Sequence, residues 1–301
     1  MTPPFSLGDI SFVGPPASAI RSMGNKAVAK MQMASASVPV VPGYHGSDQS
    51  NDRPVLIHEA ELVGFPLLVK AVSGGGGKGM KLAACRKDLP EALESARRES
   101  QSAFGDDSLL LERYVGKPRH VEVQVVADKL GNVASFFDRD CSVQRRHQKI
   151  LEEAPAPGLS PKYHATLSDA ARRAALAAGY TNAGVEHPVT EAITGMDLVT
   201  LQLLVAAGGE LPLLQQQQVD GHAFEARLYA ESPDKQFLPG AGRVEVWQPP
   251  TESSEVDSGI ETGDLVGTHY DPMIAKIIVH GSDRRKALAT MRKALDQMCV
   301  C

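Results

Sequence analysis

Short apolar runs separated by turn residues recur along the chain and predict strands. Alternating apolar and polar positions are typical of half-buried strands, and Gly, Pro, Asn and Asp cluster where the runs end. Asp128, Gly131 and Asn132, for example, predict a tight turn between two strands. The expected strands are residues 9–14, 67–72, 81–84, 109–111, 121–126, 133–137, 222–230, 243–247 and 273–279.

Apolar residues three or four positions apart predict helices between these strands. One helix is expected to begin at Asp88 as its N-cap, with Pro90 in the first turn and Glu91 completing a capping box. Strands and helices together predict an α+β fold with mostly antiparallel sheet. The other expected helices cover residues 20–33, 160–178 and 191–207, and a last one carries Leu288, Met291, Leu295 and Met298.

Composition and charge narrow the class of protein. A chain of 301 residues is too long for one small core, which predicts two domains or subdomains, and the polar run 215–218 predicts a linker. The net charge of -5 gives no reason to expect nucleic acid, and no apolar run approaches the roughly 18 residues of a membrane span. No secretory signal or Arg-rich transit peptide is visible. The cysteines match no zinc-site spacing and are expected as thiols: Cys85, Cys141, Cys299 and Cys301.

A glycine-rich loop between two expected strands is the strongest chemical signal. Consecutive glycines let the backbone approach a phosphate and direct several N–H groups towards it. Lys70 before the loop and Lys78 within it add two ammonium groups. Gly79 follows Lys78 where a Walker A motif requires Ser or Thr, so the loop is interpreted as a flap over a nucleotide. A flexible glycine hinge is the alternative. The loop glycines are Gly74, Gly75, Gly76, Gly77 and Gly79.

Several ordered stretches together resemble one family, the biotin carboxylase module of the ATP-grasp superfamily. The resemblance covers nearly the whole chain and implies an ATP-grasp fold, with two α+β subdomains around the nucleotide, followed by a partial biotin carboxylase C-terminal domain. The stretches are residues 13–17, 23–26, the glycine loop, 118–124, 138–142, 144–149, 152–158, 186–191, 221–227 and 269–273.

The same resemblance divides the chain. Residues 1–22 are expected to be a remnant of the N-terminal domain, residues 23–214 the ATP-grasp domain, and residues 215–301 a shortened C-terminal domain. No Met-Lys biotin-attachment motif is present. Residues 43–46 and 94–99 are most similar to the biotin-bearing alpha subunit of methylcrotonoyl-CoA carboxylase. That similarity implies a role in leucine degradation and a location in the mitochondrial matrix.

Nucleotide contacts are implied by the family resemblance. Lys26, Lys70 and the glycine loop match positions that hold ATP phosphates. The hinge that reads adenine matches Glu112, Tyr114 and Val115 at the end of an apolar strand, and His120 resembles the ribose contact, although a satisfied interfacial histidine is the alternative. Further contacts with the nucleotide are implied for Gln144 and His147, within a charge run that also fits a solvated face.

The family activates bicarbonate with ATP as carboxyphosphate and captures the carbon dioxide on biotin. Lys149 matches the bicarbonate-binding cation and Glu186 the base that takes its proton. Arg227 matches the arginine that stabilises the biotin enolate, although strand alternation also favours a salt bridge with Glu225. The implied partners are ATP, bicarbonate, Mg²⁺ or Mn²⁺, biotin on a carrier domain and a carboxyltransferase beta subunit.

The sequence departs from the family between Gly184 and Val185. There the family has two strands that carry two metal-binding glutamates and a Met-Asn-Thr-Arg segment with the catalytic arginine. Here Gly184 is followed at once by Val185 and Glu186, so no metal ligand is assigned. Phosphoryl transfer depends on a metal and on cations that neutralise developing charge. The alternative to an enzyme is therefore a non-catalytic fragment that at most binds adenine nucleotide or a carboxylase partner.

Overall fold

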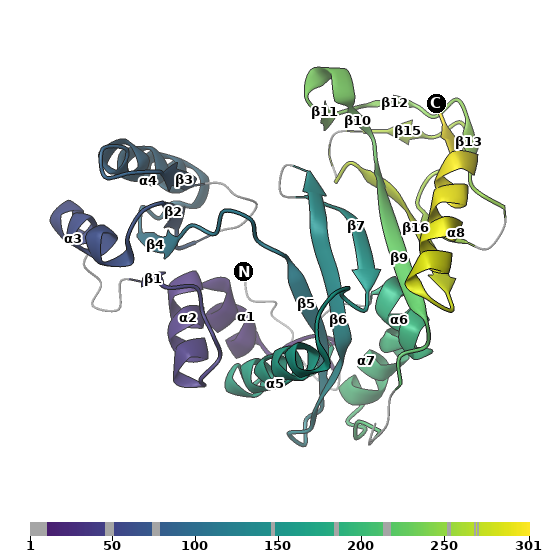
Figure 1. Ribbon diagram of the computed structural model, residues 1–301, viewed down its shortest axis with the longest axis horizontal. Coiled ribbons are helices and arrows are strands. Elements are labelled where there is room, and N and C mark those ends of the chain that lie inside the picture. The colour runs from purple at the N-terminus through teal and green to yellow at the C-terminus, as the bar shows by residue number, and fades with distance from the viewer. Residues whose placement is uncertain are drawn as a thin grey trace.

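A small sheet with helices around it and a larger sheet make up this computed structural model (Figure 1). Every strand pairing between described residues is antiparallel, which confirms the predicted α+β class. The structure describes residues 11–45, 51–73, 79–145, 148–183, 187–212, 218–251, 254–267, 269 and 271–301. Outside these ranges lie the 184/185 junction, residues 215–217 of the predicted linker, Gly74, Gly75, Gly76, Gly77, Lys78, His147 and Glu186.

The small sheet has the order β1-β4-β2-β3. Its strands are β1 (Gly43–Tyr44), β2 (Leu67–Ala71), β3 (Met80–Ala83) and β4 (Leu109–Arg113), and they confirm the predicted hairpin across the glycine loop. Alternation buries one face of β2 and β4 against α3 (Arg53–Val63) and α4 (Leu89–Phe104). The fully buried residues of this core include Leu56, Leu67, Val69, Leu109 and Leu111.

The larger sheet has the order β14-β16-β9-β7-β6-β5-β8. Consecutive β-hairpins build its centre, because β5 pairs with β6 and β6 with β7, and β9 then pairs with β7 after a long connection. Its strands are β5 (Val121–Ala127), β6 (Val133–Arg145), β7 (Gln148–Ala154), β8 (Asn182–Ala183), β9 (His222–Tyr229), β14 (Glu255–Ser258) and β16 (Met273–Gly281).

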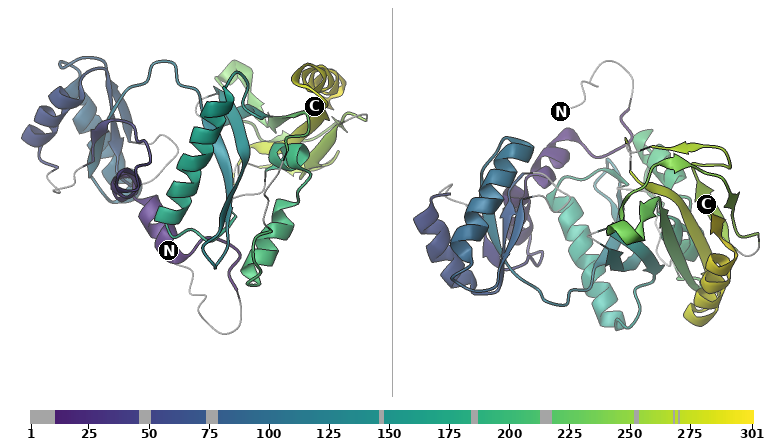
Figure 2. Two further views of the ribbon diagram at one scale, coloured as in Figure 1. Left: turned by 60° about the horizontal axis from the view of Figure 1, so that its bottom comes forward. Right: turned by 90° about the horizontal axis from the view of Figure 1, so that it is seen from above.

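Helices cover both faces of the larger sheet (Figure 2). Along β9, Ala223 packs with α6 (Pro188–Thr194), whereas the next residue, Phe224, packs with α8 (Arg284–Gln297). Successive side chains point to opposite faces of a strand, so α6 and α8 lie on opposite sides. On β5 and β6, α7 (Leu198–Ala206) covers the face of Phe136, and α5 (Pro161–Ala177) covers the other.

Short strand pairs lie beyond the end of β9. They join β10 (Glu231–Ser232) to β11 (Leu238–Pro239), β12 (Gly242–Arg243) to β15 (Leu265–Val266), and β13 (Trp247–Gln248) to β17 (Cys299–Val300), with the 3-10 turn η1 (Pro233–Lys235) between β10 and β11. All four cysteines are free thiols, as expected. Within the described ranges no single helix is long and apolar enough to cross a membrane, although the bent pair α6 and α7 reaches that length and composition together.

Two expected single helices are each two helices. Residues 20–33 were expected to be continuous, but α1 (Ala17–Gly24) ends where Asn25 turns extended and caps α2 (Lys26–Ser35), with the Asn25 side chain accepting the N–H groups of Ala27 and Val28. The helix expected at 191–207 breaks between α6 and α7, whose axes differ by 96°. Helix periodicity alone does not detect such caps.

Other element predictions need correction. The capping box at Asp88 is wrong, because the Asp88 carboxylate instead accepts the N–H groups of Ala84 and Cys85 in the preceding turn. The strand at 243–247 is two separate strands, since Arg243 pairs with Leu265 and Trp247 with Val300. On α8, Leu288 and Leu295 are 37% and 46% exposed, and the buried face is instead Ala287, Met291 and Ala294.

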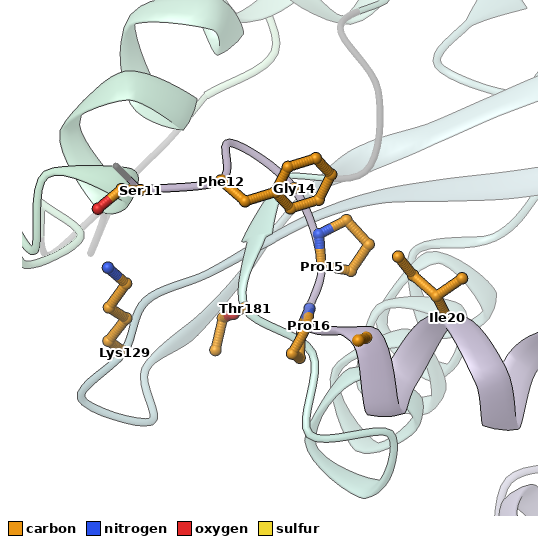
Figure 3. Close-up of a pocket in the computed structure, with 9 residues that line it drawn as sticks. Ser11, Phe12, Gly14, Pro15, Pro16, Ile20, Lys129 and Thr181 are labelled. Atoms are coloured by element: carbon orange, nitrogen blue, oxygen red, sulfur yellow. The ribbon is translucent and has the colours of Figure 1, made fainter. Parts of the chain in front are cut away.

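The described part of the strand expected at 9–14 is also wrong. Residues 11–16 run without strand pairing past β8 and the β5–β6 turn (Figure 3). Phe12, Pro15, Pro16 and Ile20 line a pocket of about 280 Å³ there, together with Lys129 and Thr181. Phe12 remains 52% exposed, so this segment contributes little to the core.

Candidate functional site

One face of the small sheet carries a cluster of lysines around a single carboxylate. The register pairs Leu68 with Glu112 and Lys70 with Leu110, which makes Lys70 and Glu112 diagonal neighbours on the face opposite the apolar core. Lys70 forms an ion pair with Glu112, and Lys30 of α2 forms a second one. Burial opposes ionisation, but the two ammonium groups outweigh it and lower the pKa of Glu112.

Lys26 lies beside this cluster because Asn25 fixes the start of α2. Its ammonium group donates to the carbonyl oxygens of Ala71, Val72 and Ser73 at distances of 3.1, 3.4 and 3.4 Å. Burial lowers the pKa of Lys26, and the charge of Lys70 lowers it further. The structure therefore brings Lys26, Lys70 and Glu112 together at the point where β2 leads into the glycine loop.

Of the predicted loop glycines, Gly79 is described, and its backbone explains why glycine is needed there. It has φ of +68°, and a Cβ would lie 2.9 Å from the Ala71 Cβ. The Gly79 carbonyl accepts the N–H of Ala71 at 2.9 Å and closes the loop onto β2. In the predicted hinge, both oxygens of Glu112 are engaged by lysines, while Tyr114 and Val115 are 37% and 51% exposed.

A second cluster lies on the larger sheet, on the face that α6 covers. The register places Glu152 of β7 opposite Glu225 of β9, and Arg227 is two residues further along the same face. The Arg227 guanidinium pairs with Glu152 and donates to Glu225 Oε1 at 3.0 Å, so the expected Glu225–Arg227 salt bridge is present. Both carboxylates are fully buried.

His187, at the N-terminus of α6, closes this cluster. Its Nε2 lies 3.0 Å from Glu152 Oε2, and its Nδ1 lies 3.8 Å from Glu225 Oε2. Burial opposes ionisation of Glu152, but His187, Cys141 and Arg227 hold its pKa well below the usual range. Burial raises the pKa of Glu225, and the neighbouring Glu152 carboxylate adds to that effect. One carboxylate is thus held as an anion while the other more readily takes a proton.

Lys149 joins this cluster through Glu122. Its Nζ lies 2.6 Å from Glu122 Oε2 and 3.7 Å from Glu152 Oε2. Burial alone would lower the pKa of Lys149, but the two carboxylates raise it, so the ammonium stays charged. Arg139 donates to the other oxygen of Glu122 at 2.7 and 3.0 Å. Burial alone would raise the pKa of Glu122, but Arg139 and Lys149 outweigh it and lower the pKa to about 2.

His120 and Gln144 lie at the exposed edge of the second cluster. Gln144 Nε2 is 2.7 Å from His120 Nδ1, and His120 Nε2 is 3.6 Å from Glu122 Oε2. His120 keeps about half of its side chain exposed, 48%, so its ring is open to a ligand. Of the residues expected around it, Lys149 and Arg227 are brought together, whereas Glu186 and His147 lie outside the described residues.

Four residues of these two clusters were not singled out by the sequence: Lys30, Glu122, Glu152 and His187. Strand alternation within residues 118–124 and 152–158 could have predicted which neighbours share a strand face with Glu122 and with Glu152. Which faces meet depends on register between segments far apart in the sequence, and periodicity does not supply that. Lys30 had a simpler signal, since it follows Lys26 by one helical turn.

The described residues do not fit a magnesium ion. The group Glu122, Glu152 and His187 has potential ligand atoms within 4.8 Å of one another. Their negative charge is already balanced by Lys149, Arg139 and Arg227. Magnesium also prefers an octahedron of oxygen ligands, whereas this group offers a buried imidazole nitrogen. The group is better explained as a network of ion pairs.

Two known families match consecutive regions of the chain. The family described as Carbamoyl-phosphate synthase L chain, ATP binding domain matches residues 25–185 and again residues 181–214. The Biotin carboxylase C-terminal domain family matches residues 225–301. The two matches to the first family meet at residues 181–185, next to the junction between Gly184 and Val185.

Curated relatives cover nearly the whole chain. The mitochondrial methylcrotonoyl-CoA carboxylase subunit alpha of Rattus norvegicus is 51% identical over 96% of this chain and 44% of its own length. Biotin carboxylase 1 of Bacillus subtilis is 40% identical over 97% of this chain and 70% of its own length. The chain thus spans less than half the length of the rat relative. The alignment with the rat subunit runs over 313 positions, whereas 96% of this chain's 301 residues is about 289.

Solved structures share the fold. The biotin carboxylase domain of Hydrogenobacter thermophilus 2-oxoglutarate carboxylase, in complex with MgADP, ADP and bicarbonate, superposes with a TM-score of 0.91 at 36% identity. It is matched over 97% of this chain and 69% of that one. Biotin carboxylase from Campylobacter jejuni gives the same TM-score at 37% identity, over 97% and 70% of the two chains.

Proposed function

The chain belongs to the biotin carboxylase family of ATP-dependent ligases, and from that premise we propose that it binds ATP and bicarbonate for the carboxylation of biotin. The observation that carries the proposal is the meeting of Lys149 and Arg227 at one buried carboxylate, Glu152. Strands β7 and β9 thereby place two cations close together. This arrangement suits the binding of bicarbonate beside the negative charge that develops on biotin.

Each cluster has its own part in this proposal. Lys26, Lys70 and the glycine loop hold the phosphates of ATP, and the backbone of residues 112–115 contacts adenine. His120 and Gln144 contact the rest of the nucleotide, together with His147. Lys149 binds bicarbonate, and Glu186 accepts its proton so that the oxyanion can attack phosphorus. Arg227 stabilises the negative charge that develops on biotin.

The relatives support a finer assignment. Similarity to mitochondrial methylcrotonoyl-CoA carboxylase alpha subunits supports leucine degradation as the pathway and the mitochondrial matrix as the location. In such an assembly biotin would arrive on a carrier domain, and a carboxyltransferase beta subunit would use the carboxylated product. ATP, bicarbonate and the carrier are then the direct partners of this chain.

A second candidate function is nucleotide binding without turnover. It is favoured because the described residues offer no group suited to a magnesium ion, which would neutralise charge on the phosphates. The family match divides at residues 181–185, and the alignment with the rat subunit has more positions than this chain supplies residues. Both observations support an internal deletion at this point. We propose that catalysis by this chain is impaired, since losing one such stabilising element typically costs about 100- to 1,000-fold in rate.

Turnover assays separate the two candidates. We expect calorimetry to detect ATP binding by this chain, and a phosphate-release assay with free biotin to detect no bicarbonate-dependent hydrolysis. The Lys149→Ala variant is the control, because it removes the bicarbonate cation and leaves the lysine cluster intact. Robust turnover that Lys149→Ala abolishes would overturn the impairment. Absence of heat and of any thermal shift at millimolar nucleotide would overturn nucleotide binding itself.

A further inference from the structure

Glu112 lies between two lysines that reach it from different elements. Lys70 approaches along the sheet face from β2, and Lys30 approaches from α2. The Glu112 side chain is 8% exposed, against 16% for Lys30 and 25% for Lys70. One carboxylate thus neutralises only one of two ammonium groups, and the surplus positive charge lies beside the start of the glycine loop.

The two lysines have different access to a phosphate. Lys70 is three residues before Ser73, where β2 leads into the loop, and it is the more exposed of the pair. Lys30 also donates to the carbonyl oxygen of Val41 at 3.4 Å, which ties it to the segment before β1. Lys70 is therefore the lysine placed to change partners.

A change of partner by Lys70 poses an electrostatic problem. A buried carboxylate that loses its cation costs far more free energy than an exposed one, because little water reaches it. If Glu112 had no other cation, it would hold Lys70 and compete with any phosphate. Lys30 removes this competition, since it still balances Glu112 after Lys70 has left.

The spacing of Lys26 and Lys30 points the same way. These lysines are one turn apart on α2, where like charges repel. Lys26 donates to the carbonyl oxygens of residues 71–73, while Lys30 turns to Glu112. Helix α2 thus places Lys26 beside the start of the loop and Lys30 against the Glu112 carboxylate.

We propose that Lys30 is a positioning residue of the nucleotide site: it retains Glu112 as its ion-pair partner and so releases Lys70 to the phosphates of a bound adenine nucleotide. This inference rests on the proposed nucleotide binding and names a residue that neither the sequence motifs nor the family resemblance identifies. Lys30 need not touch the nucleotide for this role.

The test is a double-mutant cycle on ADP affinity, measured by calorimetry with the whole chain. Lys30→Met should weaken ADP binding roughly tenfold, the size expected when one charge-assisted contact is lost. Lys30→Arg keeps the charge and should bind like the wild type. Glu112→Gln removes the competing carboxylate but lies in the proposed adenine hinge, so the affinity of this single variant is the reference for the double variant. Adding Lys30→Met to Glu112→Gln should cause no further loss of affinity, because Lys70 has no carboxylate left to leave.

Each result has a defined meaning. A double variant roughly tenfold weaker than Glu112→Gln would overturn the proposal in favour of direct phosphate contact by Lys30. Unchanged affinity in Lys30→Met would overturn it outright. Lys162→Met, on the exposed start of α5, controls for the lost charge. Melting curves of all variants verify folding, and Lys30→Arg supplies the comparison if Lys30→Met is unstable. If the wild type binds no ADP, the proposed function fails as well.

Discussion

Glu122 is the residue that links the cations of the larger sheet. One of its oxygens accepts from Arg139 and the other lies 2.6 Å from Lys149. Arg139 in turn donates to Thr190 of α6 at 2.8 Å, so the network around this carboxylate joins β5, β6, β7 and α6. A partly buried acid with two cationic partners from neighbouring strands should contribute to stability in a manner that depends on pH.

Replacing Glu122 tests this contribution. The folded pKa is lowered from 4.5 to about 2, so the ionised group stabilises the fold fully above its unfolded pKa. That stability is lost as the pH falls from about 4.5 towards 2. Melting temperatures across pH 3 to 7 should therefore show a deficit for Glu122→Gln that is largest near neutral pH and shrinks in acid.

The control for Glu122→Gln is Glu210→Gln, which changes an exposed carboxylate outside the helices. Its melting temperature should follow that of the wild type at every pH. A Glu122→Gln deficit of constant size across the range would contradict the assignment, because it would show that packing and not ionisation accounts for the loss.

At the scale of elements, Gly195 decides where α6 ends. It has φ of +65° and its N–H donates to the Glu191 carbonyl at 2.8 Å, which closes the helix with a left-handed residue. Asp197 then caps α7 by accepting the N–H of Thr200. The break turns α7 by 96°, so that Leu198 and Leu201 reach Phe136 on β6.

Gly195→Ala should destabilise the protein by roughly 1 kcal/mol, because an L-residue pays a steric cost in the left-handed region. No atom lies within 4 Å of the Cβ that alanine would add, so the effect isolates the backbone. Gly24→Ala is the matched control, with equally open space and no left-handed backbone in α1. It should be neutral or stabilising in thermal denaturation. Equal losses in both variants would contradict this account.

The same break shows why the sequence predicts some elements and not others. Strands at residues 67–72 and 121–126 were predictable because alternation is local, and so was the N-terminus of α5 at Ser160. The helix breaks at Asn25 and Gly195 were missed because both residues fit an amphipathic pattern until their caps are known. Lys149 and Arg227 were expected from family motifs. Their shared partner Glu152 follows only from the pairing of β7 with β9.

At the scale of the whole molecule, two regions meet through a few polar contacts. The Gln32 side chain of α2 donates to the Ala177 carbonyl of α5, and Arg173 of α5 donates to the carbonyl oxygens of Ala36 and Ser37. Figure 1 shows the small sheet to one side of the larger sheet, and the segment between β4 and β5 joins the two. The lysine cluster and the Glu152 cluster lie on these separate sheets.

The larger sheet also has an incompletely paired strand. Beyond β6, the described pairing of β5 is with β8 at Val126 and Ala127 alone, which leaves residues 121–125 without a strand partner on that side among the described residues. Backbone groups at a sheet edge need partners. Residues 181–185, where the two family matches overlap, include β8. We infer that the two strands implied by the family resemblance belong at this edge.

Restoring those strands should restore catalysis. The alignment with the rat subunit has roughly two dozen positions more than this chain supplies, and the aligned rat segment can be inserted between Gly184 and Val185. If the segment supplies the metal ligands and the catalytic arginine, bicarbonate-dependent ATP hydrolysis should rise by at least about 100-fold, since each such element is typically worth that much. The melting temperature should rise as well, because the added strands pair with β5.

A scrambled segment of equal composition should change neither quantity. Higher stability without hydrolysis would place the defect elsewhere in the site, and unchanged stability would exclude the β5 edge as the position of the strands.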